Sequence, residues 1–211
     1  MKSIIFLAPP AAGKGTLSEY LVKKFGYVHI STGEILRDYA EEKESLAHQL
    51  EKGEYIEDDI IIKLVTQKIA SLPKNTLFIL DGVPRTLKQA QMLDPYLPSN
   101  VIPINIEVDP SILLKRVLGR VVCPQCDRNY NIYFREFKPH VDNLCDDCKI
   151  SLEKRSDDTE GSFLKRYQKY QESVLPIIKF YQEKGTLIRL ENKDEDQNEL
   201  IKKLVEVIDD N

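Results

Sequence analysis

The sequence opens on a short run that is apolar at every position, and similar runs recur along the chain. A strand with one exposed face alternates apolar and polar residues, whereas a strand buried on both faces stays apolar throughout. Stretches with helical spacing separate the runs, and this alternation predicts a parallel, doubly wound α/β sheet of five strands. The expected strands are 3–7, 27–30, 77–80, 101–108 and 186–190, and the expected helices are 17–25, 60–72, 86–97, 110–118, 157–184 and 198–208.

Two segments interrupt the alternation. Residues 31–60 are polar and helical without a strand of their own, and residues 121–156 contain the four cysteines and many turn formers. A chain of 211 residues is long enough for one core with small appendages. We therefore expect a core domain of residues 1–30, 61–120 and 157–211 with two insertions, 31–60 and 121–156.

Composition narrows the functional classes. The net charge of −4 gives no overall attraction to nucleic acid. The apolar run 4–12 is too short to span a bilayer, is broken by Pro9 and Pro10, and lacks the flanks and cleavage site of a secretory signal. We expect a cytoplasmic protein with no membrane partner and no nucleic-acid partner.

The segment from Ala8 to Thr16 follows the first expected strand and opens the first helix. It reads Ala-Pro-Pro-Ala-Ala-Gly-Lys-Gly-Thr, and this context predicts a phosphate-binding loop, or P-loop. Backbone N–H groups and the helix N-terminus both favour an anion there. Lys14 would reach the β and γ phosphates, and the Thr16 hydroxyl would contact phosphate or metal. The consensus has glycine where Ala8 stands, and a plain strand–turn–helix junction is the alternative interpretation.

The cysteines form two C-x-x-C pairs separated by 18 residues: Cys123, Cys126, Cys145 and Cys148. This spacing fits tetrahedral zinc with four thiolate ligands, which leaves no open catalytic position. The predicted zinc is therefore structural and supplies much of the folding energy of a small insertion. Paired disulfides or free thiols are the alternatives. A nucleic-acid-binding zinc ribbon is disfavoured by the acidic residues of the interval: Asp127, Glu136, Asp142, Asp146 and Asp147. The histidines (His29, His48 and His140) show no partner pattern and receive no role.

Three further segments, together with the P-loop, resemble the adenylate kinase family over almost the whole chain. They are Ile30–Arg37 (ISTGEILR), then Asp81–Thr86 (DGVPRT) with Gln89, and finally Gly119-Arg120, Arg155–Asp158 and Arg166. The resemblance implies the reaction ATP + AMP ⇌ 2 ADP with Mg²⁺, a helical AMP-binding insertion at 31–60, a mobile lid at 121–156 and a monomer. A zinc-stapled lid is also known within this family.

The resemblance also implies roles for individual residues. The ATP-binding set is Ala11, Ala12, Gly13, Lys14, Gly15, Thr16, Arg116, Arg120, Asn129, Tyr130 and Lys193. The AMP-binding set is Thr32, Gly33, Arg37, Glu54, Tyr55, Ile56, Gly82, Val83, Pro84, Arg85, Gln89, Arg155 and Arg166. The catalytic set is Lys14, Arg85, Arg120, Arg155 and Arg166. Asp81, at the carboxyl end of a buried strand, is expected to hold Mg²⁺ through water.

The chain departs from the family pattern at three positions. The family usually has glycine at the positions of Ala8 and Ala11, and an aromatic residue at that of Val83. Alanine is tolerable at negative φ, but a required positive φ would cost stability or phosphate contact.

Several local interpretations stay open at this level. Arg116 serves the site or caps a helix end, and Asp157 and Asp158 orient arginines or begin the next helix. Gln89 reads the adenine edge or is an exposed helix residue. Pro176 kinks or breaks the long helix, and Gly119 and Gly161 are candidate hinges. The rival functions are a kinase for another nucleoside monophosphate and a nucleotide-binding regulator without turnover.

Overall fold

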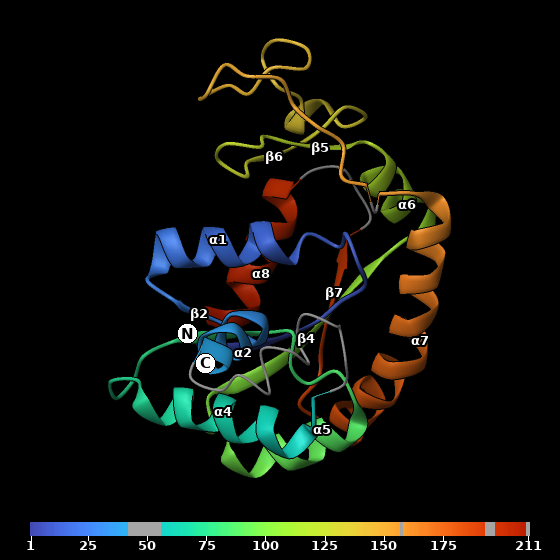
Figure 1. The fold of residues 1–211 in the computed structure, drawn as a ribbon. Coiled ribbons are helices and arrows are strands. Elements are labelled where there is room, and N and C mark those ends of the chain that lie inside the picture. Colours follow the sequence, from blue (N-terminus) through green and yellow to red (C-terminus); the bar gives the residue numbers. More distant parts are fainter. Residues whose placement is uncertain (42–55, 157, 193–196, 210–211) are drawn as a thin grey trace.

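The computed structural model describes residues 1–41, 56–156, 158–192 and 197–209. Its centre is a five-stranded parallel sheet in the order β2-β3-β1-β4-β7 (Figure 1). The strands are β1 (Ser3–Leu7), β2 (Val28–Ser31), β3 (Phe78–Asp81), β4 (Val101–Val108) and β7 (Ile188–Asn192). All four pairings between neighbours are parallel. The predicted fold class is confirmed, and the observed strand bounds lie within two residues of the expected ones.

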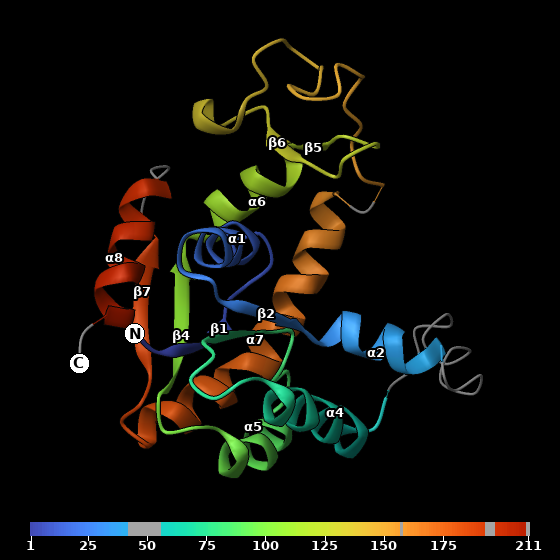
Figure 2. The ribbon, with the colours of Figure 1, turned by 90° about the vertical axis from the view of Figure 1, so that its left-hand side faces the viewer.

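Helices cover both faces of this sheet (Figure 2). They are α1 (Lys14–Phe25), α2 (Thr32–Glu41), α4 (Asp58–Ser71), α5 (Leu87–Leu93), the 3₁₀ turn η1 (Asp94–Tyr96), α6 (Pro110–Leu118), α7 (Glu160–Glu183) and α8 (Gln197–Asp209). In β1, Ile4 and Phe6 pack with α1, α6 and α8, whereas Ile5 and Leu7 pack with α4, α5 and α7. Burial on both faces explains why the strand is apolar from Ile4 to Leu7, since each such side chain stabilises the fold by about 1.5–3 kcal/mol.

The helix α7 continues through Pro176, so of the two effects expected there, a kink or a break, the break is not found. The cap of α7 is Thr159, whose side chain accepts a hydrogen bond from the Ser162 N–H at 3.2 Å. Proline removes one donor from a helix, and the apolar residues Ile177 and Ile178 that follow it are buried in the core. Tertiary packing therefore outweighs the local cost.

The cysteine-bearing insertion projects from the core above α1 and α6 (Figures 1 and 2). It contains the antiparallel pair β5 (Arg120–Val122) and β6 (Asn129–Asn131) and the 3₁₀ turn η2 (Arg135–Phe137). Its apolar core is small: Val121, Cys123, Tyr130, Cys145 and Leu152. In the other insertion, α2 is described, and residues 42–55 lie outside the described part. Among the described residues, no helix is both long and apolar enough to cross a membrane.

Candidate functional site

The P-loop joins the carboxyl end of β1 to α1, as predicted. Two of its residues have positive φ: Gly13 at 95° and Ala11 at 63°. Glycine adopts this conformation freely, but for alanine it carries a steric cost of about 1–2 kcal/mol. Ala8 is not among the described residues with positive φ and is buried beneath the loop. Of the two alanines that depart from the pattern, only Ala11 therefore bears strain.

Lys14 and Asp81 meet beside this loop. Lys14 Nζ lies 3.8 Å from Asp81 Oδ1, and both side chains are less than one-third exposed. Burial lowers the pKa of Lys14, although the Asp81 carboxylate opposes the shift. Asp81 ends β3, and Lys14 begins α1 after the loop that follows the neighbouring strand β1, so both lie at the edge of the sheet where open α/β sheets bind their ligands.

His29 completes this contact and had no predicted role. Its Nε2 lies 3.3 Å from Asp81 Oδ2, and this hydrogen bond raises the pKa of His29 and lowers that of Asp81. The residue is placed by register, since β2 and β3 are parallel neighbours in which Ser31 pairs with Asp81. The available signal was a histidine within an otherwise apolar strand, but a sequence does not show which strand lies next to it.

Asp81, Gly82 and Arg85 form one turn with Thr32. The Thr32 hydroxyl donates to the Asp81 carbonyl at 3.1 Å, which ties the start of α2 to the end of β3. Gly82 has φ of 85°, and a Cβ there would stand 3.0 Å from Arg85 Nη2. Glycine is thus required both for the backbone angle and for the close approach of the guanidinium. Val83, in place of an aromatic residue, is buried in the core.

Gln89 is 3% exposed, so its interpretation as an exposed helix residue is wrong. Its Oε1 accepts from the Arg85 main-chain N–H at 2.7 Å, and its Nε2 donates to Asp58 Oδ1 at 2.7 Å. Its own N–H donates to the Thr86 hydroxyl that caps α5. The adenine contact of Gln89 stays a prediction.

Three arginines are predicted to border and follow the lid, and Asp158 joins two of them. Arg120 binds both carboxylate oxygens, with Nε 2.7 Å from Oδ2 and Nη2 2.5 Å from Oδ1. Arg166 Nη2 lies 3.7 Å from the same Oδ1, and the Asp158 side chain is 2% exposed. Asp158 does not cap α7, so its interpretation as an orienting residue is confirmed. Arg155 lies on an exposed loop just before, and Asp157 falls outside the described residues.

Arg116 extends from α6 to the P-loop. Its Nη1 donates to the Ala11 carbonyl at 3.3 Å, and its guanidinium lies 5.9 Å from the centre of the Phe134 ring in the insertion. The residue therefore links the loop, the core helix and the lid rather than only ending a helix. Its contact with ATP stays a prediction.

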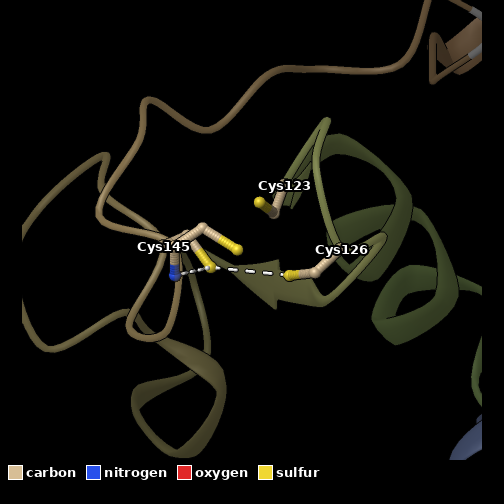
Figure 3. A group of neighbouring side chains, drawn as sticks. Cys123, Cys126 and Cys145 are labelled. Carbon is tan, nitrogen blue, oxygen red and sulfur yellow. Dashed lines mark hydrogen bonds between the residues drawn. The ribbon is translucent and has the colours of Figure 1, made fainter.

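The cysteine side chains converge (Figure 3). All four sulfur atoms lie within 4.8 Å of one another, and Cys126 Sγ and Cys145 Sγ are 3.7 Å apart. Four sulfurs bound at about 2.3 Å to one ion would stand about 3.8 Å apart in a tetrahedron. The thiols are free of disulfides, so the arrangement fits a Cys₄ metal centre.

The two C-x-x-C loops have the same backbone design. In each, the carbonyl of the first cysteine accepts a 3.0 Å hydrogen bond from the N–H four positions later, and that later residue has positive φ. These residues are Asp127 at 56° and Lys149 at 59°. The turns aim backbone N–H groups at sulfur, as with Cys148 N to Cys145 Sγ at 3.4 Å.

Tyr130 lies inside the insertion beside this cluster. It is 4% exposed, and its hydroxyl donates to Cys145 Sγ at 3.5 Å and accepts from the Asp146 N–H at 2.8 Å. The Tyr130 hydroxyl and the Cys148 N–H are the leading causes that lower the pKa of Cys145 to about 6. The structure thus gives Tyr130 a part in holding a thiolate, and its predicted ATP contact remains untested. Asn129, the next ATP candidate, is exposed and donates to the Asp127 carbonyl.

A cavity of about 430 Å³ opens beside the P-loop. It is lined by α1, α8 and the η2 turn of the insertion, and Thr16 is the one predicted site residue in its wall. The charged residues that would act on phosphate do not line it, so we locate the chemistry at Lys14 and Asp81.

The remaining predicted residues fall into two groups. Ile56 is buried against Leu36 at the start of the α4 segment, and Gly33 lies in the first turn of α2. Glu54, Tyr55 and Lys193, and the side chain of Arg37, lie outside the described residues.

Comparison with known proteins identifies close relatives. The sequence profile of the family described as adenylate kinase matches residues 6–186. The chain is 36% identical over 200 residues to an adenylate kinase of Thermotoga neapolitana, with 90% of both chains covered. It is 38% identical over 211 residues to that of Borrelia garinii subsp. bavariensis, with 97% of both covered. It is also 39% identical over 209 residues to that of Borrelia turicatae, covering 97% of this chain and 98% of the relative.

Proposed function

This chain belongs to the adenylate kinase family, and we propose that it transfers the terminal phosphoryl group of Mg-bound ATP reversibly to AMP, giving two ADP. The observation that carries the proposal is the 3.8 Å approach of Lys14, in the P-loop at the start of α1, to Asp81 at the end of β3. Phosphoryl transfer needs in-line positioning and relief of charge more than an acid or a base. A partly buried cation beside a cradle of backbone N–H groups supplies both.

On the ATP side, Lys14 and the N–H groups from Ala11 to Thr16 hold the β and γ phosphates. Burial favours the neutral form of Lys14, and an incoming polyphosphate would favour its charged form. The bound polyphosphate would then offset the free-energy cost of keeping Lys14 charged.

On the AMP side, Arg85 and Arg37 bind the phosphate with planar guanidinium forks. The close approach of Arg85 Nη2 to Gly82 holds that fork against the end of β3. Arg120, Arg155 and Arg166 stabilise the charge that develops on the transferring group. Asp158 positions Arg120 and Arg166 by pairing with both of them.

Asp81 fits the magnesium assignment. Its pKa is lowered by the hydrogen bond from His29 and by Lys14, so it is an ionised oxygen ligand suited to a hydrated ion. Bound magnesium neutralises charge on the β and γ phosphates. His29 and Lys14 engage one carboxylate oxygen each and keep the group directed at the loop.

The lid assignment is zinc at Cys123, Cys126, Cys145 and Cys148, where it would be structural. Closure of the lid and of the 31–60 insertion would exclude water and limit hydrolysis. Because the thiols are unpaired, the same proposal places the protein in a reducing compartment such as the cytoplasm. The monomeric state is part of the proposal.

The test is a coupled assay of ADP formation from MgATP with AMP, UMP, CMP or GMP as acceptor. Turnover with AMP alone is the expected result. Faster turnover with another monophosphate would overturn the base assignment and retain the mechanism. ATP binding without turnover of any acceptor would favour a regulator and overturn the proposal.

A further inference from the structure

We propose that Asp58 is a specificity-determining residue for the acceptor, because it holds the Gln89 amide in the one orientation that reads adenine. The inference rests on the proposed function and deepens it. It concerns the discrimination between AMP and monophosphates whose base has the donor and acceptor positions of adenine exchanged.

Asp58 is the first residue of α4, and its carboxylate turns inward. An acidic residue in a first turn usually stays near solvent, where it favours the helix dipole. Asp59 does so and is exposed, whereas Asp58 is 5% exposed. The inward side chain reaches α5, which runs beside α4 in both views (Figures 1 and 2). Its partner there is Gln89, also buried.

Two contacts determine which way the Gln89 amide faces. An ionised carboxylate only accepts, so the amide group 2.7 Å from Asp58 Oδ1 is the NH₂. A main-chain N–H only donates, so the atom 2.7 Å from the Arg85 nitrogen is the amide oxygen. A flipped amide would place donor against donor and acceptor against acceptor in a buried site. The donor and acceptor properties of these two partners therefore fix the orientation of the Gln89 amide.

The amide keeps one hydrogen and one oxygen lone pair for a ligand. The Watson–Crick edge of adenine presents a donor at N6 and an acceptor at N1, which match the free lone pair and the free hydrogen. Hypoxanthine presents an acceptor at position 6 and a donor at N1, which is the reverse. Guanine has the same reversed pair and an additional amino donor. A site with such fixed polar groups rejects a mismatched base strongly, because buried groups are left unpaired.

The experiment measures kcat/KM for AMP and for IMP with MgATP in the purified protein and three variants. Asp58→Leu removes the acceptor and keeps the branching and the number of side-chain heavy atoms, and Asp58→Asn keeps an acceptor oxygen at the same place. Asp59→Asn removes the neighbouring exposed charge from the same helix end. We expect Asp58→Leu to lower the AMP-to-IMP ratio of kcat/KM by about tenfold or more, since the Gln89 amide loses one of the two hydrogen bonds that fix its orientation. Asp58→Asn and Asp59→Asn should keep the ratio within about threefold.

The ratio separates specificity from stability. If Asp58 only supported the fold, Asp58→Leu would lower kcat/KM equally for both substrates. The unchanged ratio would overturn the inference. If the unaltered protein does not prefer AMP, the proposed function fails first, and the inference fails with it. A clear AMP preference that Asp58→Leu preserves would sink the inference alone.

A second variant decides the matter if Asp58→Leu does not fold. In Asp58→Asn combined with Gln89→Glu, the new asparagine can donate to the new carboxylate, so the buried pair stays satisfied. The carboxylate then offers only acceptors to the base, which suits the N1–H and amino donors of guanine. We expect the AMP-to-GMP ratio of kcat/KM to fall by at least about tenfold, and an unchanged ratio would contradict the proposal.

Discussion

The sheet end that holds Lys14 and Asp81 and the insertion that holds the cysteines position their side chains by different means. At the sheet end, β1 and β3 are pinned by apolar clusters on both faces, and the loops only extend from their ends. In the insertion, the buried core has five residues, two of which are cysteines. The sheet end is held by hydrophobic burial, whereas the insertion has little such burial and, under the zinc proposal, would depend on an ion bound by its cysteines.

This difference predicts that the two regions lose order separately. A core built on burial should tolerate the loss of a metal, whereas an insertion of 36 residues (121–156) has too little apolar area to fold by itself. The position of a segment along the chain does not decide whether it keeps its order without a metal. What matters is the apolar surface that each segment can bury.

The largest expected effect is that of removing one of the proposed metal ligands. Cys145→Ser should unfold the insertion, because structural zinc contributes on the order of 10 kcal/mol to such modules. The core should keep its own unfolding transition within a few degrees. Hydrogen exchange along the chain, with calorimetry, separates the two.

The matched control is His140→Ala, which changes an exposed insertion residue outside the sulfur cluster. If residues 121–156 of Cys145→Ser kept normal hydrogen-exchange protection with no metal bound, the expected difference between core and insertion would be contradicted.

The second-largest effect is expected on turnover, in a variant whose core and insertion both stay folded. Lys14→Met should lower kcat/KM by about 10³-fold or more, because a cation at the transferring phosphate is lost. Metal content and hydrogen-exchange protection of the insertion should stay as they are. Lys23→Met serves as control, since this lysine lies exposed on the same helix and pairs with Glu19. Equal activity in the two variants would refute the role given to Lys14.

A smaller effect is expected where the two regions join. A Cβ at Gly119 would stand 2.3 Å from Asn131 Oδ1 and 2.5 Å from Tyr133 Cδ2. Gly119→Ala should therefore destabilise the packing of β6 against the end of α6 by about 1–3 kcal/mol. Exchange rates in β5 and β6 report this change, while the sheet should stay protected.

Gly161→Ala is the control for this experiment, because nothing lies within 4 Å of its Cβ position at the start of α7. It should be neutral or stabilising by about 0.5–1 kcal/mol. If the two variants behave alike, the contact at Gly119 does not matter to the junction. Unchanged lid motion in Gly161→Ala would also count against its interpretation as a hinge.

The smallest effect concerns the strained alanine. Ala11→Gly should stabilise the protein by about 1 kcal/mol, because the positive φ of Ala11 costs more than the added freedom of glycine in the unfolded chain. Ala8→Gly should instead destabilise it by a similar amount, since Ala8 lacks that strain and loses a buried methyl group. Thermal unfolding of the two variants, which should shift in opposite directions by about 2–4 °C, is the measurement.

Much of this architecture could be read from local pattern. The bounds of β1, β4 and α6 agree with the predicted ones, because each has a clear apolar period and a clear stop signal. The P-loop and the cysteine spacing are equally local, and the structure brings the four sulfurs together. The domain boundaries and the ligand assignments stay predictions. Of the kink or break expected at Pro176, the break is not found, because burial of the residues that follow outweighs one lost hydrogen bond.

Local sequence pattern was enough to predict the succession of strands and helices along the chain, the loop that opens α1 and the grouping of the four cysteines, since each depends on residues near one another in the chain. The contacts of His29 with Asp81, of Asp58 with Gln89 and of Asp158 with Arg120 and Arg166 could be found from the folded chain alone. The first two pairs and the Asp158–Arg120 pair are 52, 31 and 38 residues apart. Such contacts depend on strand order, register and helix packing, which are set by the burial of the whole core and not by any local pattern.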